Sequence, residues 1–482
     1  MNEQPCHPFG PVLILDDLAD GVLHMSALFL TEPGAPPPTL KADRVTATAT
    51  RLADYDQATV WRARFSLPAD RPSSYTCNGE VFEVAGDVCG DLRLAYISCN
   101  GEETGDLERE GSERNAMWAR LGREHRERPF ALLLHGGDQV YADEVTRGHP
   151  LSHDWPDRYA KNPPGDALLG LRHHLRQRFV ERYSALYSSP EIAWLLARVP
   201  SLMQWDDHDI CDGWGSLSRS RTASPIGQAI FETARESFLV FQQGAADGDL
   251  PTRFADPQGR HLGWCVQAPN LRLLAPDLRS ERTRRRIIGP DGWAMLNREA
   301  AQPAPGHTFV LSSVPLLGPR LSLLELLMVV IPGMQKYEDD LRDQWQSRAH
   351  RDEWRRMLRL VHSMGHPNGQ DITAVSGEIH LATRATMQGD EGPPFHQLVA
   401  SGIAHRAPQT LWARVLGALA WLGEAPLPDQ PIRIEPLPGL KSRYVAERNY
   451  LILERISDRW SARWELEKSG ISDPLILSTN RH

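Results

Sequence analysis

The chain has 482 residues, which is too long for one ordinary hydrophobic core and predicts two or more domains. Hydrophobic residues make up 41% and charged residues 24% of the composition, which excludes a largely disordered or collagen-like chain. The formal net charge of -9 disfavours general binding to phosphate backbones, so we do not expect nucleic acid as the main partner.

Residues 1–10 have neither a basic stretch nor an apolar core, so no export signal is visible and the sequence predicts a cytoplasmic location. The longest apolar stretch, residues 316–334, is interrupted by Pro319, Arg320 and Glu325, which is poor material for a membrane span. We expect a buried or lid-forming helix there and no membrane span. The six cysteines contain no C-x-x-C pair and predict neither a disulfide framework nor a zinc knuckle.

From residue 45 to residue 84, apolar residues alternate with polar ones, with the period of two that is typical of β-strands. Asn78-Gly79 within this stretch predicts a hairpin turn. The pattern indicates a small N-terminal β-rich domain that resembles a β-sandwich. A cluster of Gly and Asp follows and suggests a boundary. We therefore predict one domain over residues 1–90 and a second over residues 91–482.

Beyond residue 91, short apolar runs alternate with longer segments whose apolar residues recur every three to four positions. The predicted strands cover residues 92–98, 130–134, 202–205, 271–275, 309–312, 373–375 and 398–400, and the predicted helices cover residues 114–128, 167–186, 227–243 and 339–362. Two further strands, at residues 450–455 and 460–466, are expected to complete the sheets. This alternation predicts an α/β layered domain.

Polar residues cluster directly after four of the predicted strands, at their carboxyl ends. The clusters are residues 98–101 (SCNG), 136–141 (GGDQVY), 206–209 (DDHD) and 376–380 (SGEIH). Open α/β sheets bind ligands at the carboxyl ends of their strands. Carboxylates, imidazoles, a phenol and a thiol that converge there would suit one or more transition metals, because a bare carboxylate cluster would repel itself.

Each cluster also has a purely structural interpretation. A Gly-Asp pair after a strand is usually a turn, and Asp-Asp-His suits the N-terminus of a helix. Glu378 and His380 would share one face of a strand, which suits two ligands of one centre and also an ordinary surface strand. Cys99 at a strand end is more often a small buried hydrophobe than a ligand. The argument for a metal site therefore depends on the four clusters together.

In their order along the chain, the four clusters resemble the motifs of the PhoD-like (alkaline phosphatase D) group of calcineurin-like metallophosphoesterases. That family shows a strand ending in S-C, followed by G-D-x-x-Y, D-D-H-E and S-G-D-x-H. Residues 274–279 (LAPDLR) resemble its L-D-x-R segment. Glu378 stands where the family usually has Asp, and Asp209 stands where Glu is common. Both keep the charge but change the reach of the side chain by one methylene.

This resemblance implies a four-layer α/β/β/α sandwich with the site at the strand ends. It also implies hydrolysis of phosphate monoesters, diesters or both by a metal-bound hydroxide, with two or more metal ions, iron with calcium being expected and zinc or manganese the alternatives. His208 would protonate or stabilise the leaving oxygen, Arg279 would clamp the phosphate, and Asn100 would hydrogen-bond to it. The implied metal ligands are Cys99, Asp138, Tyr141, Asp207, Glu378 and His380.

His135 and His405 are interpreted as structural or supporting residues. Two alternatives stay open beside the phosphoesterase. One is a phosphodiesterase or phospholipase that acts on lipid headgroups, with residues 316–334 as a lid facing the substrate. The other is a degenerate fold kept as a binding module, which the four occupied motifs disfavour. We expect a small phosphoester as substrate, and the sequence leaves the oligomeric state undetermined.

Overall fold

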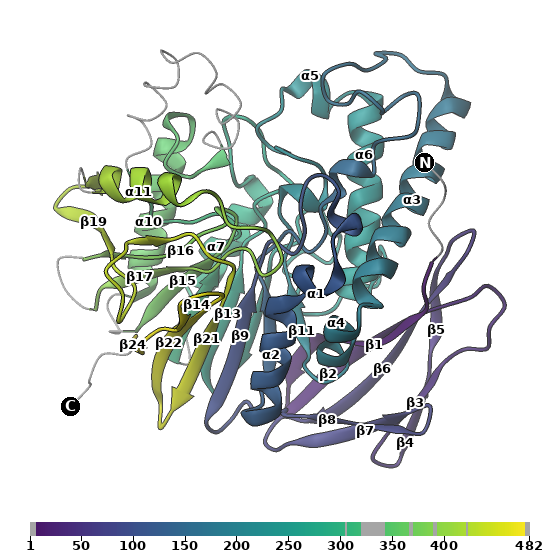
Figure 1. The fold of residues 1–482 in the computed structure, drawn as a ribbon, viewed down its shortest axis with the longest axis horizontal. Helices are drawn as coiled ribbons and strands as arrows, with labels where there is room; N and C mark the ends of the chain where they lie inside the picture. Colours follow the sequence, from purple (N-terminus) through teal and green to yellow (C-terminus); the bar gives the residue numbers. More distant parts are fainter. Residues whose placement is uncertain are drawn as a thin grey trace.

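A computed structural model describes residues 6–303, 306–319, 343–365, 370–388, 393–420 and 423–477 of the protein. These residues form three β-sheets with helices around them (Figure 1), which confirms the mixed α/β class. Most of the helix expected in residues 316–334 lies outside the described residues, which stop at residue 319 and resume at residue 343. In the described part of the chain, none of the helices is long and apolar enough to cross a membrane.

The largest sheet has eleven strands and carries the first three strands predicted beyond residue 91. Its order is β23-β22-β21-β9-β10-β11-β1-β2-β6-β5, with β24 beside β22, and the labels in Figure 1 run from β24 on the left to β5 on the right. Strands β9, β10 and β11 are parallel, and β1 pairs in parallel with β11 through Ile14 and Ser201. The bounds are β1 Phe9–Ala19, β2 Val22–Thr31, β5 Thr50–Asp54, β6 Thr59–Pro68, β9 Leu92–Ile97, β10 Leu132–His135, β11 Ser201–Met203, β21 Asn449–Ile456, β22 Arg459–Leu466, β23 Gly470–Ile471 and β24 Leu475–Ile476.

The second sheet has nine strands in the order β12-β13-β14-β15-β17-β16-β19-β18, with β20 beside β16. Its central strands β13, β14, β15 and β17 are parallel. The bounds are β12 Trp264–Ala268, β13 Asn270–Ala275, β14 Gly306–Leu311, β15 Ile372–Ser376, β16 Ala382–Met387, β17 Phe395–Val399, β18 Glu424–Leu427, β19 Gln430–Glu435 and β20 Tyr444–Val445.

Alternation along the buried strand β14 shows how the two large sheets are packed. Phe309 and Leu311 join the core that is shared with the first sheet, whereas Val310 between them joins a second core. That second core contains the apolar residues of α7 (Pro290–Ala300) and α10 (Arg351–Gly365). Successive side chains of a strand point to opposite faces, so one face of this sheet packs on the first sheet and the other on helices.

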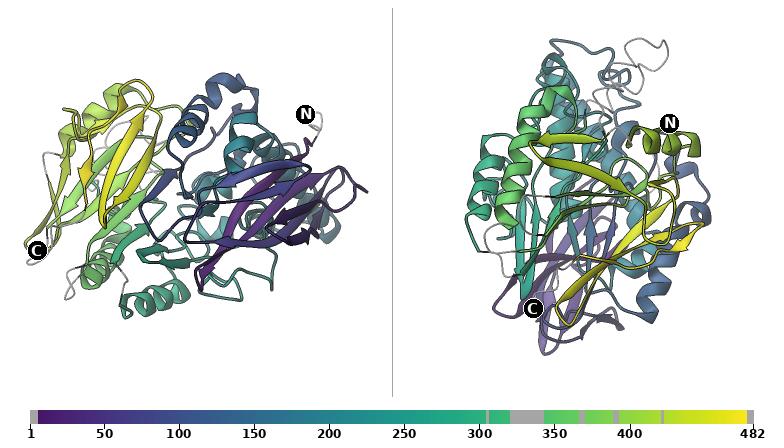
Figure 2. Two further views of the ribbon diagram at one scale, coloured as in Figure 1. Left: turned by 90° about the horizontal axis from the view of Figure 1, so that it is seen from below. Right: turned by 90° about the vertical axis from the view of Figure 1, so that its left-hand side faces the viewer.

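A third, four-stranded sheet is formed by N-terminal residues, in the order β4-β3-β7-β8 (purple in Figure 2). Its strands are β3 Thr39–Ala42, β4 Val45–Thr48, β7 Ser73–Cys77 and β8 Glu80–Val84. Asn78 and Gly79 connect β7 to β8 with φ of 53° and 81°, as a tight hairpin turn with two left-handed residues requires. The predicted hairpin is confirmed.

The rest of the N-terminal region belongs to the eleven-stranded sheet. β5 and β6 join β2, and β2 joins β1, which pairs with β11. The alternation pattern did not predict β1 and β2. The division into two domains at residue 90 stays a prediction, and the pairing of β1 with β11 shows that both parts share one sheet.

In the part of the chain that the structure describes, the α-helices are α1 Gly111–Arg114, α2 Ala116–Glu127, α3 Gly165–Tyr187, α4 Pro190–Leu196, α5 Arg219–Thr222, α6 Pro225–Ser237, α7, α10 and α11 Thr410–Leu419. Each of the four predicted helices overlaps one or more of these, with two differences, whereas α4, α5, α7 and α11 were not predicted. The helix predicted over residues 227–243 changes to a π-helical turn at Phe238–Gln242. The helix predicted over residues 339–362 is interrupted in the described residues: Asp343 is helical, residues 344–347 form bends and turns, a 3-10 turn follows at Arg348–His350, and α10 begins at Arg351.

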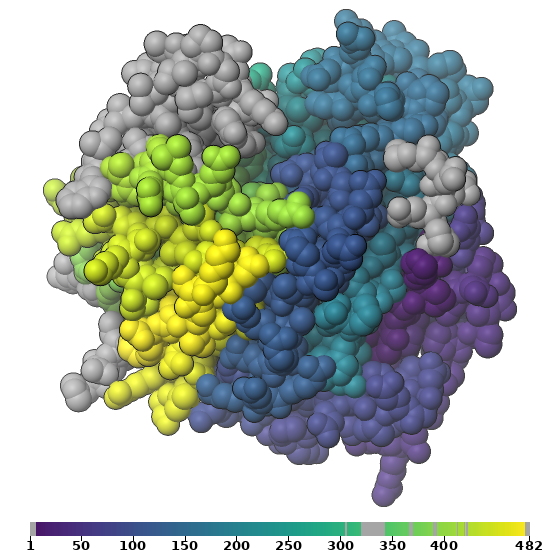
Figure 3. All heavy atoms as spheres, viewed as in Figure 1, coloured from purple at the N-terminus to yellow at the C-terminus, as the bar shows by residue number. Residues whose placement is uncertain are grey.

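Distant parts of the chain meet across the molecule. Figure 3 shows the yellow C-terminal residues against the blue residues that follow β9. Arg120 of α2 bonds to Glu465 of β22 at 2.9 Å, which is one contact between these two regions. The C-terminal strands therefore complete the first sheet, as predicted.

Candidate metal centre

The carboxyl ends of β9, β10 and β11 meet at one edge of the first sheet, because the three strands are parallel. Cys99 follows β9, Asp138 follows β10, and Asp206 and Asp207 follow β11. The N–H of Cys99 donates to the carbonyl of Gly137 at 3.2 Å and ties the first two loops together. The strand-end clusters of the sequence thus lie side by side, where open sheets place their ligands.

Gly137 allows the loops after β10 and β11 to approach closely. Its φ is +107°, and a Cβ at this position would lie 2.6 Å from the Cβ of Asp206. Asp138 and Cys99 also have positive φ, 55° and 54°. Such backbone strain on residues other than glycine concentrates at functional sites. The loop conformation brings Asp138 to the two aspartates that follow β11.

Asp138, Asp206 and Asp207 form a buried acidic group, in which one oxygen of each residue lies within 4.8 Å of the others. Oδ1 of Asp138 and Oδ2 of Asp206 are buried and have no hydrogen-bond partner among the described residues. Burial raises the pKa of Asp206 to about 6, and burial also raises the pKa of Asp138. Carboxylates this close repel one another unless cations or protons neutralise them, so the group fits a metal ion.

Softer donors surround Asp138. The sulfur of Cys99 is 3.5 Å from Oδ2 of Asp138 and 3.1 Å from the hydroxyl of Ser401. The hydroxyl of Tyr141 is buried without a partner in the described part of the chain. Burial and the nearby Cys99 raise the pKa of Tyr141. A thiol, a phenol and carboxylates in one place form a mixed donor set that suits transition metals.

Glu103, His380 and His405 form a second group, with one possible ligand atom of each within 4.8 Å of the others. The two imidazole rings stack with their centroids 3.5 Å apart, and Nδ1 of His380 has no partner in the residues that the structure describes. Nε2 of His405 lies 3.3 Å from Oε1 of Glu103. The sequence analysis treated His405 as a supporting residue and missed Glu103, because both lie in irregular loops outside the recognisable motifs.

Glu378 lies outside these groups. Both of its carboxylate oxygens accept from the side chain of Gln344, at 2.7 and 2.6 Å. β15 ends at Ser376, and Glu378 and His380 have φ of 70° and 53°. The expectation that these two residues share one face of a strand is therefore wrong, since neither is in a strand.

His208 is held between an acid and an aromatic ring. Its Nδ1 is 2.9 Å from Oδ2 of Asp143, and its ring stacks on Tyr141 with centroids 4.3 Å apart. The other oxygen of Asp143 accepts the N–H of Asp212 at 2.8 Å, which fixes the carboxylate. Burial lowers the pKa of His208, but the charges of Asp143, Asp207 and Asp138 and the hydrogen bond to Asp143 together outweigh burial, and the net pKa is raised. Asp143 lies two residues beyond the G-D-x-x-Y motif, and the sequence analysis missed it.

The two side chains expected to contact phosphate are turned inward. Arg279 is fully buried, and all of its N–H groups are taken by carboxylates and a carbonyl. Asn100 is 1% exposed, and its carbonyl oxygen accepts from the indole of Trp118 at 2.7 Å. Arg279 has no N–H group left for a phosphate, so its interpretation as a phosphate clamp needs correction. The amide nitrogen of Asn100 donates to the carbonyl of Gln139 at 3.5 Å, and a contact of Asn100 with phosphate stays a prediction.

Asp209 and His135 have structural contacts. Oδ2 of Asp209 accepts the N–H groups of Asp138 at 2.8 Å and Asp206 at 2.9 Å, and it therefore holds the two loops together instead of facing the acidic group. Nε2 of His135 is 3.1 Å from the hydroxyl of Ser201. Burial lowers the pKa of His135 to about 4, which keeps the ring neutral.

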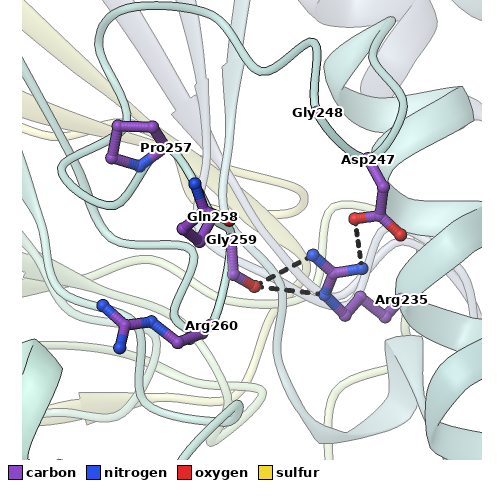
Figure 4. A pocket seen from close by; sticks show the side chains of 7 residues that line it. All are labelled: Arg235, Asp247, Gly248, Pro257, Gln258, Gly259 and Arg260. Carbon is purple, nitrogen blue, oxygen red and sulfur yellow. Dashed lines mark hydrogen bonds and ion pairs between the residues drawn. The ribbon is translucent and has the colours of Figure 1, made fainter.

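A surface pocket is lined by Arg235, Asp247, Gly248 and residues 257–260 (Figure 4). The guanidinium of Arg235 already pairs with Asp247 at 2.7 Å and donates to the carbonyl of Gly259. None of the lining residues belongs to the two ligand groups described above. The pocket is thus separate from the candidate metal centre.

The sequence model of a family described as PhoD related phosphatase matches residues 73–337, which is more than half of the chain. The chain belongs to the PhoD-related phosphatase family. The matched part of the chain contains Cys99, Asp138, Asp206 and Asp207, whereas residues 376–380 lie beyond it.

Two further comparisons agree with this family. The chain is 26% identical over 332 residues to an uncharacterized protein of Saccharomyces cerevisiae, YGR266W, with 56% of this chain and 47% of the yeast protein covered. The match thus spans about half the length of that relative. The fold is similar to the solved structure of PhoD, with a TM-score of 0.59 and 11% identity, over 100% of this chain and 94% of that one.

Proposed function

We propose that this PhoD-related phosphatase hydrolyses phosphate esters with metal ions held at the carboxyl ends of β9, β10 and β11. The observation that carries the proposal is the buried group of Asp138, Asp206 and Asp207, where two carboxylate oxygens have no partner among the described residues. Membership of the family supports phosphoesterase activity. The expected fold of such an enzyme is a four-layer α/β/β/α sandwich, which the packing of the two large sheets supports.

Asp138 is the proposed bridge between two metal ions. Its Oδ2 faces Cys99, and its carboxylate lies within the group formed with Asp206 and Asp207. A thiolate and a phenolate suit iron and carboxylates suit calcium, with zinc or manganese as alternatives. Such ions supply a deprotonated water near neutral pH and offset the charge on the phosphoryl oxygens. The proposed ligands are Cys99, Asp138, Tyr141, Asp206, Asp207 and His380.

Glu378 is left out of this proposed ligand set because it lies outside the two groups of converging ligand atoms, and Gln344 donates to both of its oxygens. Asp206 is added to the set because one of its oxygens is buried without a partner among the residues described. Two neighbouring aspartates follow β11, and the motif alone did not distinguish which of them faces Asp138.

His208 is the proposed general acid for the leaving oxygen. Asp143 holds Nδ1 of the imidazole, so Nε2 is the atom available for proton transfer. A carboxylate that orients an imidazole in this way fixes its tautomer and supports the imidazolium form. This role does not require Arg279 or Asn100 to touch the substrate.

The proposal covers small phosphomonoesters and phosphodiesters, lipid headgroups included, because the arrangement described here acts on the phosphoryl centre and not on the alcohol. A degenerate binding module would need some ligand positions to be missing, whereas Cys99, Asp138, Tyr141, Asp206 and Asp207 are all present. The cytoplasmic location expected from the sequence stays a prediction.

Metal removal tests the proposed function. Dialysis against a strong chelator should abolish cleavage of chromogenic monoesters and diesters, and adding back iron with calcium, or zinc or manganese, should restore it. Asp138→Asn is nearly isosteric but neutral, so it should lower kcat about 100-fold or more while the unfolding midpoint changes little. Full activity in the metal-free protein, or in Asp138→Asn, would overturn the proposal.

A further inference from the structure

Arg279 connects the acidic group to a carboxylate that none of the motifs contains. Its Nε donates to Oδ1 of Asp206 at 2.5 Å, and its Nη2 donates to Oδ1 of Asp207 at 3.3 Å. The remaining N–H groups donate to the carbonyl of Trp214 and to Asp343. All five N–H groups of this guanidinium therefore have an acceptor. A guanidinium with all of its N–H groups bonded is held in one position, and its charge is paired with nearby carboxylates.

Asp343 pairs with the two terminal nitrogens of the Arg279 guanidinium. Its two carboxylate oxygens accept from Nη1 at 2.9 Å and from Nη2 at 2.6 Å, which is the strong bidentate geometry of an arginine and a carboxylate. Arg282 also pairs with Asp343, at 3.0 Å. The side chain of Asp343 is only 4% exposed, so water screens these contacts weakly.

The contacts of Arg279 decide which oxygens of the site aspartates are left for a metal. Oδ1 of Asp206 accepts from Arg279 and also from the hydroxyl of Ser313 at 2.7 Å. Its Oδ2 is left buried and without a partner in the described residues. Asp207 is fixed similarly, by Arg279 on Oδ1 and by the N–H of Gly213 on Oδ2 at 3.0 Å. Two donors on one oxygen of Asp206 orient the other toward the acidic group.

Removing Asp343 should weaken metal binding for two reasons, one of charge and one of geometry. Arg279 is a cation beside the position where metal cations are expected, and on its own it would oppose their binding. Asp343 places a negative charge against this guanidinium and keeps it aligned. Without Asp343, Arg279 would be less well neutralised and freer to rotate over Asp206 and Asp207.

We propose that Asp343 is a positioning residue of the metal centre, which holds Arg279 so that Arg279 orients Asp206 and Asp207 toward the metal ions. The inference rests on the proposed function, since it concerns the same metal centre. Residues that orient metal ligands through hydrogen bonds typically change metal affinity by about 10–100-fold when they are lost. Asp343 acts through Arg279, so the lower end of that range is expected.

The test is a metal titration that needs no substrate. Metal-stripped wild-type protein and Asp343→Asn are titrated calorimetrically with Mn²⁺, Zn²⁺ and Fe²⁺, and the ion that binds the wild type most tightly is compared. Asp343→Asn should raise the Kd about tenfold with unchanged stoichiometry. An unchanged Kd would overturn the inference and leave the proposed function standing. Absence of binding to the wild type would overturn both.

Glu454→Gln is the matched control. Glu454 is a buried carboxylate that also pairs with two arginines, Arg93 at 3.5 Å and Arg128. Arg93 is near the start of β9, about 20 Å along the extended strand from Cys99. This substitution removes a buried charge of the same kind and should leave the Kd unchanged. If it weakens metal binding as much as Asp343→Asn does, the effect is a general loss of stability and the inference fails.

Asp343→Glu covers the case in which Asp343→Asn does not fold. It keeps the negative charge but lengthens the side chain by one methylene, which displaces Arg279 relative to Asp206. The Kd should then rise by less than in Asp343→Asn, yet measurably. A Kd equal to that of the wild type in Asp343→Glu would show that the geometry of this contact does not matter, and would contradict positioning.

Discussion

The imidazole of His208 and the carboxylate of Asp143 are 2.9 Å apart, next to the ring of Tyr141. If His208 protonates the leaving oxygen, His208→Ala should slow esters of poorly acidic alcohols by about 100-fold or more, and activated aryl esters much less. The reason is that a good leaving group departs without a proton. The measurement is kcat across a series of leaving groups with increasing pKa.

Asp143→Asn serves as the companion of His208→Ala. It keeps a side chain of the same shape beside Nδ1 but removes the charge that supports the imidazolium. It should therefore also slow esters of poor leaving groups more than activated esters, but the loss of kcat should be smaller than in His208→Ala. Equal loss across all leaving groups in both variants would assign His208 a binding or electrostatic role.

At the residue scale, the sequence predicted that polar residues after β9, β10 and β11 converge, and the structure places Cys99, Asp138 and Asp207 close together there. Their role as metal ligands stays a proposal. Asp206 joins them in the structure but was not selected from the sequence, because its position relative to Asp138 depends on the backbone conformation after β11. Asp343 was hidden in a predicted helix, since its importance comes only from its contact with Arg279.

At the scale of elements, the loops after β10 and β11 approach each other closely at the site. Gly137→Ala would place a Cβ 2.6 Å from that of Asp206, at a φ of +107°. It should destabilise the protein by roughly 1–3 kcal/mol through backbone strain and displacement, and it should also weaken metal binding. Denaturant unfolding and metal titration of the same preparation measure both effects.

Gly21→Ala is a control that separates backbone strain from displacement of the neighbouring loop. Gly21 also has a positive φ, 73°, but a Cβ there would meet nothing within 4 Å. This control should show only the conformational cost of an alanine in the left-handed region, with unchanged metal affinity. If both variants behave alike, the close approach of the two loops is not important for the site.

The strands that were predicted beyond residue 91 lie within a few residues of the observed ones, because short buried runs flanked by polar clusters are a strong pattern. Seven strands that the structure describes in this region were not predicted: β12, β16, β18, β19, β20, β23 and β24. β1 and β2 were also missed. Four consecutive residues of β1, Val12, Leu13, Ile14 and Leu15, are fully buried, since β1 lies inside the sheet and is covered on both faces. A strand of this kind has no alternation for the period-two rule to detect.

At the scale of the whole molecule, the buried His125 and His307 and the partly buried His396, all outside the ligand groups, predict sensitivity to acid. Burial lowers the pKa of His125 and His396 to about 4 and that of His307 to about 3. In the unfolded chain histidine titrates near about 6.5, so acidification protonates the unfolded state first. Stability present above about pH 6.5 should be lost progressively toward about pH 4, by roughly 2–3 kcal/mol for a fully buried histidine.

Denaturant unfolding of the metal-free protein at a series of pH values checks this expectation. In the wild type, Nδ1 of His125 accepts a hydrogen bond from the N–H of Phe130 at 3.1 Å. His125→Asn removes the titrating imidazole but keeps a hydrogen-bond acceptor near this N–H. The variant should lose less stability than the wild type between about pH 6.5 and about pH 4. Parallel curves for the two proteins would contradict the assignment of acid sensitivity to these histidines.

The pairing of strands that are far apart in the sequence affects how the protein is made. β1 is completed early in synthesis but pairs with β11 through Ser201, and β9 pairs with β21, where Leu94 faces Leu453. A ribosome must therefore release nearly the whole polypeptide before the first sheet can close. Until then, the edges of β1 and β9 are open to other chains. We expect nascent chains of this protein to need protection by chaperones, because long-range strand pairing is slow to form.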